Sequence, residues 1–238
     1  MPSNKEKRPT AKHRRVPYVV TIDGPGGVGK STVAKLLAQR LGIMYLDTGA
    51  TYRALAYAAL TRHLNPVTDV VQLTELARAL PLHLEPVDGQ RLRVELDGLD
   101  ISEAIRTEQV SEAAAQLSQH PAVREAMVEL QRRLANRHGV VVEGRDTGSV
   151  VFPHAPYKFF LDANPLVRAR RRQRELAKRY GTRLPLAQVK EQLQFRDGLD
   201  RSRRVGPLVT PAGATTIDTT RRCASQVVRL MLQRIARG

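Results

Sequence analysis

Residues 18–32 read YVVTIDGPGGVGKST, a short apolar run that passes directly into a glycine-rich turn. The apolar run is typical of a buried strand, and a glycine-rich turn after a strand is a common phosphate-binding loop. Two nucleotide-binding motifs match this stretch of sequence. Gly24, Gly26 and Gly29 match G-x-G-x-x-G, which is typical of dinucleotide binding. The mononucleotide P-loop, G-x-x-x-x-G-K-[ST], matches Gly24, Gly29, Lys30 and Ser31.

Lys30 and Ser31 decide between the two patterns. A dinucleotide site uses an acidic residue near the end of the second strand, and Asp47 lies about there, so spacing alone excludes neither pattern. A P-loop also needs a lysine that reaches the phosphates and a hydroxyl that holds Mg²⁺, which a dinucleotide site does not require. We therefore interpret this stretch as a P-loop whose binding residues are Gly24, Pro25, Gly26, Gly27, Val28, Gly29, Lys30, Ser31 and Thr32, with Ser31 as the metal ligand.

Strand and helix patterns alternate along the rest of the chain. Four short, mostly apolar runs predict strands, at residues 16–23, 42–47, 140–144 and 157–163, and ATTIDTT at 214–220 is the fifth candidate strand. Helical patterns follow the first two runs and the last one, which predicts an α/β fold with a five-stranded parallel sheet. Most of these strands end in an acidic residue, and ligands bind at the carboxyl ends of such strands. The acids expected to face the site are Asp23, Asp47, Glu143, Asp162 and Asp218.

Residues 81–102 break this alternation. Apolar and polar residues alternate there, and the Asp-Gly pairs at 88–89 and 97–98 are typical of tight turns between antiparallel strands. We expect a small antiparallel sheet inserted between helices, with solvated edges and a position outside the main core.

Composition narrows the class of protein. The net charge of +16 is concentrated in two stretches: residues 1–15 hold six Lys or Arg and one Glu, and residues 168–204 hold thirteen Lys or Arg and four acids. The first stretch is typical of a disordered basic tail. The second has helical periodicity, and its residues 168, 170, 171, 172 and 174, all arginines, are interpreted for the most part as a solvated helix face.

The sequence argues against a membrane span, an internal disulfide and two classes of P-loop protein. No apolar run approaches the ~20 residues of a membrane span. The single cysteine, Cys223, cannot form an internal disulfide and is interpreted as a packing residue of the last helix. A reducing, cytoplasmic setting is therefore expected. The N-K-x-D motif of GTPases and the L-S-G-G-Q motif of transporter ATPases are absent, whereas a kinase of a small phosphorylated acceptor would need arginines such as those of 168–204.

Longer motifs give a specific resemblance. DTGATYR (47–53), PAVREAM (121–127), VVEGRDTGSVVFP (141–153) and RDGLDRSRRVGPL (196–208) resemble the signature stretches of bacterial cytidylate kinases, in order and spacing. The resemblance implies a three-layer P-loop kinase fold that uses ATP and Mg²⁺ to phosphorylate CMP and dCMP. It also implies a P-loop core over 16–64 and 107–238, a nucleoside monophosphate (NMP)-binding insertion over 65–106, and a helical lid over about 168–204.

The resemblance also implies residue roles. Lys30, Arg145, Arg196 and Arg203 would act on the transferring phosphate, and Asp23 and Glu143 would hold metal-bound waters. Contacts to the acceptor nucleotide would come from Thr48, Arg53, Arg124, Arg145, Asp146, Arg196, Asp200 and Arg203. The residues Arg196, Asp200 and Arg203 have the i, i+4, i+7 spacing of one helix face.

The base-reading pair also makes chemical sense without the family. Cytosine offers an amino donor that the Asp146 carboxylate can accept, and acceptors to which the Arg124 guanidinium can donate. Uracil would leave a buried carboxylate facing a carbonyl, so we expect UMP to be a poor acceptor. Two residues depart from the family: Ala115 stands where a serine is frequent, and Thr147 stands where a bulkier apolar residue is usual.

Two alternatives stay open at this point. One is a P-loop kinase of another small molecule, such as shikimate or a different nucleotide. The other is a basic nucleic-acid-binding ATPase, whose hydrolysis would respond to DNA or RNA. We expect the kinase of CMP, acting as a monomer with no membrane and no nucleic acid partner.

Overall fold

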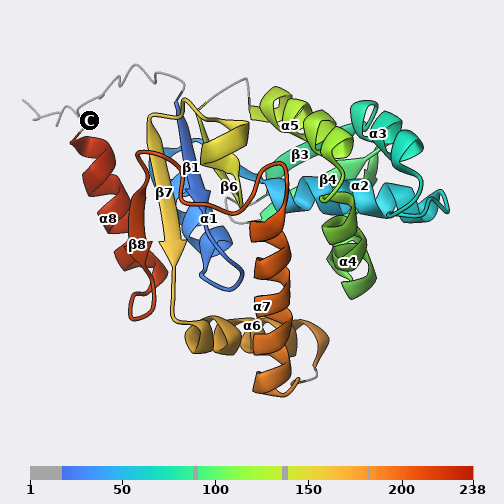
Figure 1. Ribbon diagram of the computed structural model, residues 1–238. Coiled ribbons are helices and arrows are strands. Elements are labelled where there is room, and N and C mark those ends of the chain that lie inside the picture. Colours follow the sequence, from blue (N-terminus) through green and yellow to red (C-terminus); the bar gives the residue numbers. More distant parts are fainter. Residues whose placement is uncertain (1–17, 88–90, 136–138, 182, 238) are drawn as a thin grey trace, which may run out of the picture.

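The computed structural model describes residues 18–87, 91–135, 139–181 and 183–237 (Figure 1). The basic segment 1–15 and the Asp-Gly pair at 88–89 lie outside these residues, so the expectations for them stay predictions.

The predicted parallel sheet is confirmed, and all five expected strands belong to it. Its order is β2-β6-β1-β7-β8, and each neighbouring pair is parallel. The strand expected at 140–144 has these bounds in the structure, and the other four are one to three residues shorter than expected. The strands are β1 Val19–Asp23, β2 Met44–Asp47, β6 Val140–Gly144, β7 Tyr157–Asp162 and β8 Thr215–Asp218. Because every strand runs the same way, β1, β2 and β6 bring their last residues to one edge of the sheet.

Helices cover both faces of this sheet and give three layers. On one face, α1 (Lys30–Leu41) and α8 (Ala224–Ala236) pack on apolar residues of β1 and β7, such as Ile22 and Phe159. On the other face, the end of α5 (Pro121–Ala135) packs on β2 and β6. Figure 1 shows α8 beside β8 and α1 behind the central strands.

Four helical segments, together with the start of α5, build a second body beside the sheet. They are α2 (Thr48–Thr61), α3 (Val70–Arg78), the short turn η1 (Ala104–Arg106) and α4 (Glu108–Leu117). A short helical segment, η2 (Thr147–Val151), follows β6.

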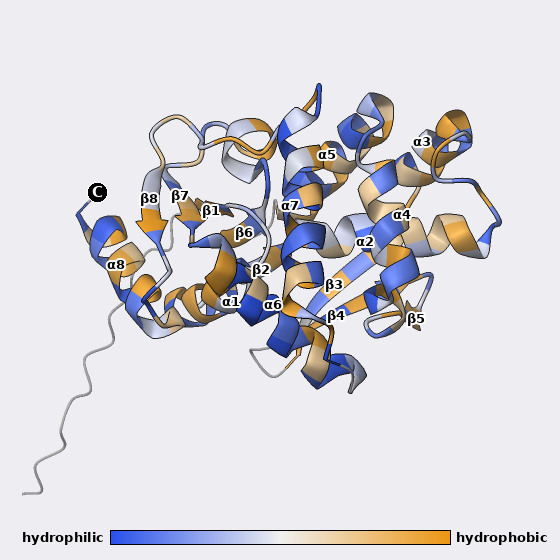
Figure 2. Cartoon of the chain, turned by 60° about the horizontal axis from the view of Figure 1, so that its bottom comes forward, coloured by the Kyte–Doolittle hydropathy of each residue, from blue (hydrophilic) through white to orange (hydrophobic). Residues whose placement is uncertain are grey.

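The expected antiparallel insertion is confirmed as three strands, β3 (Leu82–Val87), β4 (Arg91–Leu96) and β5 (Leu99–Asp100). Asp97 and Gly98 form the tight turn between β4 and β5, both with positive φ, 51° and 79°. The expected position outside the main core is only partly right, because the insertion forms a sheet of its own but Leu92 is buried in the apolar cluster of the parallel sheet. Val94 and Leu96 are buried in one apolar cluster with residues of α2, α3, α4 and α5. In Figure 2, β3 and β4 run alongside α2, and all three carry hydrophobic residues.

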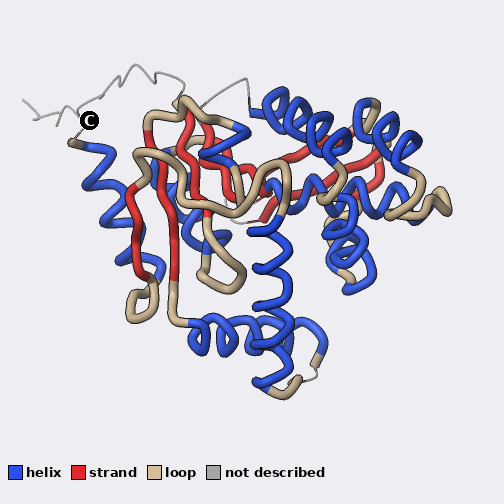
Figure 3. The backbone as a smooth tube through the Cα atoms, in the orientation of Figure 1, coloured by secondary structure: helices blue, strands red, loops and turns tan. Residues whose placement is uncertain are grey.

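The basic stretch folds as two packed helices, α6 (Pro165–Tyr180) and α7 (Leu186–Ser202), at the carboxyl edge of the sheet (Figure 3). Ala169 of α6 packs on Val189 and Leu193 of α7. In the part of the chain that the structure describes, none of the helices is long and apolar enough to cross a membrane.

Cys223 differs from the expectation of a packed residue. It is exposed and lies at the N-cap of α8, where its backbone N–H donates to Gln226.

Candidate active site

The glycine-rich turn between β1 and α1 has the backbone geometry that only glycines allow. Gly27 has a φ of +76°, and a Cβ there would lie 2.8 Å from the carbonyl oxygen of Arg168. Helix α1 begins at Lys30, so its free N–H groups point into the turn and favour an anion there. The Lys30 ammonium lies across the turn and donates to the Pro25 carbonyl at 2.9 Å. Burial, and after it the Arg145 cation, lower the pKa of Lys30 to about 8.

A cavity of about 730 Å³ opens from this turn across the carboxyl edge of the sheet. It brings together most of the residues that the sequence proposed, from the P-loop, α2, α5, β6 and α7. The proposed residues that line it are Gly26, Gly27, Gly29, Lys30, Ser31, Thr32, Thr48, Arg53, Arg124, Arg145, Asp146, Arg196, Asp200 and Arg203. Three P-loop residues are outside this lining, namely Gly24, Pro25 and Val28, of which Val28 is buried in the apolar core.

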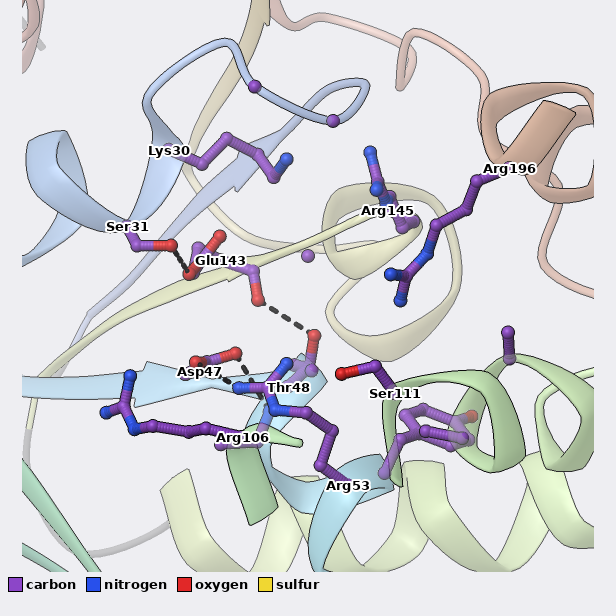
Figure 4. A pocket seen from close by; sticks show the side chains of 18 of the residues that line it. Lys30, Ser31, Asp47, Thr48, Arg53, Arg106, Ser111, Glu143, Arg145 and Arg196 are labelled. Atoms are coloured by element: carbon purple, nitrogen blue, oxygen red, sulfur yellow. Dashed lines mark hydrogen bonds and ion pairs between the residues drawn. The ribbon is translucent and has the colours of Figure 1, made fainter. Parts of the chain in front are cut away.

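Glu143, at the end of β6, organises the hydroxyls at one side of the cavity (Figure 4). Its carboxylate accepts from Ser31 Oγ at 2.5 Å and from Tyr45 Oη at 3.1 Å, and its carbonyl accepts from Thr48 Oγ1 at 2.8 Å. Burial raises the pKa of Glu143, and the Asp47 charge raises it further. Asp47 also lines the cavity. Two of the five strand-end acids therefore face the site, as expected.

The other three strand-end acids do not line the cavity. Asp23 is fully buried, and both of its oxygens accept from the turn after β6: from Thr147 N and Oγ1 at 2.8 Å each, and from Gly148 N at 2.7 Å. Burial raises the pKa of Asp23 to about 6. Asp162 and Asp218 accept from backbone N–H groups of their own loops. The expectation that these three face the site is wrong, because local N–H donors hold their carboxylates elsewhere.

Most of the cavity's arginines are already paired with carboxylates. Arg53 bonds Asp47 at 3.1 Å. Arg145 Nε lies 3.0 Å from Asp200, and its Nη1 donates to the Gly24 carbonyl at 2.8 Å. Arg203 also pairs with Asp200, although Arg203 lies at the C-cap of α7, just beyond the helix on which its spacing had placed it.

Arg196 is the exception among these arginines. It makes no hydrogen bond or ion pair with any residue that the structure describes, and its side chain extends toward the cavity (Figure 4). Burial, and after it the neighbouring Arg145 cation, lower its pKa to about 10. A guanidinium held this way still carries its charge at neutral pH and has all of its donors free for an anion.

The two proposed base readers also line the cavity. Arg124 of α5 forms a buried ion pair with Asp146, which follows β6. Gly206 packs against both side chains, and a Cβ at this residue, whose φ is +64°, would lie 2.3 Å from each. Burial raises the pKa of Asp146, while Arg124 opposes that rise. A buried donor and a buried acceptor therefore stand side by side at one wall of the cavity.

Sequence reasoning missed a carboxylate that joins the P-loop to the two basic helices. Asp197 of α7 is 1% exposed, accepts from the Gly26 N–H at 2.9 Å and pairs with Arg168 of α6. Arg168 also donates to the Gly26 carbonyl at 3.1 Å. The only sequence signal was an acid within a basic helical stretch, which is also typical of a surface ion pair.

The interpretation of the α6 arginines as a solvated face is therefore only partly right. Arg170 and Arg174 are exposed. Arg168 is buried on Asp197, and Arg171 donates to the carbonyls of Val28 and Thr219 at 3.3 and 2.6 Å. These two arginines fix α6 to the loops of the core.

Comparisons with known proteins agree with this geometry. A family model described as cytidylate kinase matches residues 20–237. The cytidylate kinase of Pelotomaculum thermopropionicum is 45% identical over 219 residues, which cover 92% of this chain and 96% of the relative. That of Klebsiella pneumoniae is 43% identical over 215 residues, covering 90% and 93%.

One solved structure is similar to this chain in fold but not in sequence. An uncharacterised protein from Eubacterium ventriosum aligns with a TM-score of 0.50 at 11% identity and covers 94% of this chain and 100% of its own. The family model and the relatives span nearly the whole chain, including every residue that lines the cavity. The chain is therefore a kinase that belongs to the cytidylate kinase family.

Proposed function

We propose that the protein transfers the γ-phosphoryl group of ATP to CMP and dCMP. The observation that carries this proposal is the cavity itself, which brings the P-loop lysine and the buried Arg124–Asp146 pair into one site. The same cavity is lined by Arg53, Arg145 and Arg196. Phosphoryl transfer depends mainly on positioning and on neutralising phosphate oxygens, which suits a cavity lined by arginines.

The donor would bind at the P-loop. The N–H groups at the start of α1 would surround its phosphates, and Lys30 would turn from the Pro25 carbonyl to the β- and γ-phosphates. This exchange is favourable because a phosphate is a charged acceptor and a carbonyl is a neutral one.

Mg²⁺ fits the residues beside the P-loop. Ser31 supplies a hydroxyl oxygen, and the carboxylate of Glu143, 2.5 Å from it, supplies an oxygen acceptor for bound water. Among the described residues, no group of three or more acidic, His or Cys side chains could hold a metal alone. This agrees with an ion held mainly by substrate phosphates, whose charge it would neutralise. Asp23 is too fully engaged with Thr147 and Gly148 to take the role expected for it.

The acceptor would lie across the rest of the cavity. Arg53, Arg145 and Arg196 would bind its phosphate, and Thr48 would contact it beside Arg53. Asp200 would accept from the pentose hydroxyls, and Arg203 would approach the phosphates from the same side. Asp146 would accept from the cytosine amino group while Arg124 donates to the ring acceptors.

The helices α6 and α7 would act as the lid. They carry the cationic side of the cavity, including Arg172 and Arg196. Closure over both nucleotides would exclude water and limit hydrolysis of ATP without an acceptor. We further propose that the protein acts in the cytoplasm as a monomer.

An acceptor panel tests this proposal. The protein is assayed with ATP and Mg²⁺ against CMP, dCMP, UMP, AMP, GMP and shikimate, with Lys30→Ala as the inactive control. We expect turnover of CMP and dCMP to exceed that of every other acceptor. A preference for another acceptor would contradict the proposal. DNA-stimulated hydrolysis that disappears on deletion of residues 1–15 would favour the nucleic-acid-binding alternative.

A further inference from the structure

Ser118 is a buried residue of the cavity wall that neither the motifs nor the family's signature stretches single out. It lies at the C-cap of α4, is 4% exposed, and lines the cavity beside Arg124 and Arg203. These two arginines come from distant parts of the chain, α5 and the end of α7. Ser118 is therefore the place where the wall made by α4 meets both of them.

Ser118 accepts a hydrogen bond from each arginine. Its Oγ accepts from Arg203 Nη2 at 2.9 Å, and its carbonyl oxygen accepts from Arg124 Nη1 at 3.3 Å. The hydroxyl proton is used as well, since Oγ donates to the Ala115 carbonyl at 2.7 Å. The direction of the hydroxyl is thus fixed by the helix, and its lone pairs face Arg203.

Because Arg124 and Arg203 place two guanidinium groups close together, a neutral hydrogen-bond acceptor such as the Ser118 hydroxyl is useful here. Arg124 and Arg203 repel each other, and burial together with this repulsion lowers the pKa of Arg203. Their Nε atoms are buried and have no hydrogen-bond partner among the residues that the structure describes. Asp146 and Asp200 compensate the charges, but each carboxylate holds its arginine from one side only. A neutral hydroxyl adds a second fixed point for Arg203 without cancelling its charge.

No other side chain on this face of α4 can replace Ser118. Ala115 lies one turn earlier on the cavity wall and has no polar side-chain atom. Ser111, a further turn away, donates to the Thr107 carbonyl at 2.9 Å, and no contact joins it to either arginine among the described residues.

We propose that Ser118 is a positioning residue for the acceptor nucleotide, and that it acts by holding Arg203 at the acceptor end of the cavity. This inference rests on the proposed function, because it assigns the acceptor to that end. It predicts that the hydroxyl matters for the acceptor and not for ATP. Without it, Arg203 would be held by Asp200 alone and would have to be ordered again when the acceptor binds.

The test compares Ser118→Ala with Ser118→Thr and with Ser202→Ala. Alanine keeps the carbonyl that binds Arg124 and removes only the hydroxyl, whereas threonine restores it. Ser202 is the matched control: it is exposed, adjacent to Arg203 in the sequence, and its hydroxyl donates to the Leu199 carbonyl. KM for CMP, KM for ATP, kcat and the thermal midpoint are measured for each protein.

We expect Ser118→Ala to raise KM for CMP about tenfold, the order of one lost hydrogen bond to a charged group. KM for ATP should stay within about twofold of wild type, and Ser118→Thr and Ser202→Ala should resemble wild type. An unchanged KM for CMP, an equal rise in both KM values, or no rescue by threonine would overturn the inference. If Ser118→Ala does not fold, rescue of folding without recovery of KM for CMP in Ser118→Thr would overturn it too.

The inference and the proposed function fail in different ways. Turnover of CMP by the wild-type protein tests the proposed function. The ratio of variant to wild type, measured with whichever nucleoside monophosphate the wild type prefers, reads out the role of Ser118.

Discussion

Each arginine proposed to bind substrate, except Arg196, already has an anionic partner in the free protein. Asp47 holds Arg53, Asp146 holds Arg124, and Asp200 holds both Arg145 and Arg203. These carboxylates limit the rotamers of long side chains before a ligand arrives, which lowers the entropy lost on binding. A phosphate that binds Arg53 exchanges one charged partner for another and leaves no buried cation unpaired.

Arg53 gives a direct test of this exchange. Arg53→Ala should raise KM for CMP by about tenfold or more, because a charged hydrogen bond to the acceptor phosphate is lost. KM for ATP should change little, because Arg53 lies on α2 and not on the P-loop. Steady-state kinetics with each substrate varied in turn measures both values. An unchanged KM for CMP together with an unchanged kcat would argue against the role given to Arg53.

The hydrogen bonds between Asp23 and Thr147 lead us to expect that kcat/KM depends on pH. Ionised Asp23 accepts three hydrogen bonds from the turn that carries Asp146, and its pKa is about 6. Protonation below pH 6 weakens these bonds, so kcat/KM should fall there. Because this pKa is raised above its usual value, the folded protein takes up the proton before the unfolded chain does. Acid between about pH 6 and pH 4 therefore favours the folded state at this group, and the loss should be one of activity.

Thr147→Val separates Asp23 from other groups that titrate near pH 6, such as the phosphate of the acceptor. The Thr147 hydroxyl lowers the pKa of Asp23, so its removal should move the acidic limb of the kcat/KM profile to higher pH. Wild type and variant are compared with the same substrate. Superimposable profiles would show that Asp23 does not control this limb. The structure thereby gives Thr147, whose presence the sequence left unexplained, a defined contact.

For single residues, the sequence predicted which side chains belong to the site better than it predicted which residues those side chains contact. Lys30 was recognisable because it belongs to the contiguous P-loop motif, and Arg145 and Asp146 were recognisable because they belong to one contiguous cytidylate kinase motif. Asp197 and Ser118 were not, because their partners Gly26 and Arg203 lie far away in the chain. Nothing in a single sequence shows that a carboxylate on one helix reaches the N–H of a loop 171 residues earlier.

Among the elements, α6 and α7 depend most on side chains that sequence reasoning assigned to solvent. The Arg168–Asp197 pair is buried and joins both helices to the P-loop through Gly26. The apolar contact between the helices is small, with Ala169, Val189 and Leu193 as its buried residues. The position of this helical pair therefore depends on the buried ion pair, since breaking one leaves an uncompensated charge.

A matched pair of variants on α6 tests this dependence. Arg168→Gln should lower the free energy of unfolding by about 3 kcal/mol, because it leaves the buried Asp197 with Arg145, 3.7 Å away, as its remaining cationic partner. Arg172→Gln removes an arginine from the half-exposed pair with Glu175 and should cost less than about 1 kcal/mol. Urea unfolding followed by circular dichroism measures both. Similar small losses would mean that Arg168 does not anchor the helices.

The elements themselves were largely predictable. Four strands of the parallel sheet are short and mostly apolar, and the fifth, β8, has the single buried apolar residue Ile217. Each strand is followed by a turn or a helix, and together these patterns located all five. The Asp97-Gly98 turn was recognisable because both residues tolerate positive φ. Which face of the insertion is buried was not predictable, since that depends on α2 and α4 covering it.

For the whole molecule, the distribution of apolar residues explains why one cavity lies between two bodies. One apolar cluster holds the parallel sheet with α1 and α8, and another holds α2 to α5 with the insertion. The P-loop belongs to the first body, and Arg53 and Arg124 lie on helices of the second. A kinase with two substrates needs this arrangement, because each nucleotide then has its own binding surface and the phosphates meet between them.

The preference for cytosine over uracil tests the central claim most directly. The claim is that the Arg124–Asp146 end of the cavity reads the base of the acceptor. Steady-state kcat/KM is measured for CMP and UMP at saturating ATP and Mg²⁺. Because uracil leaves a buried carboxylate facing a carbonyl, we predict a CMP-to-UMP ratio of at least about 100. Equal specificity constants for the two nucleotides would contradict the account.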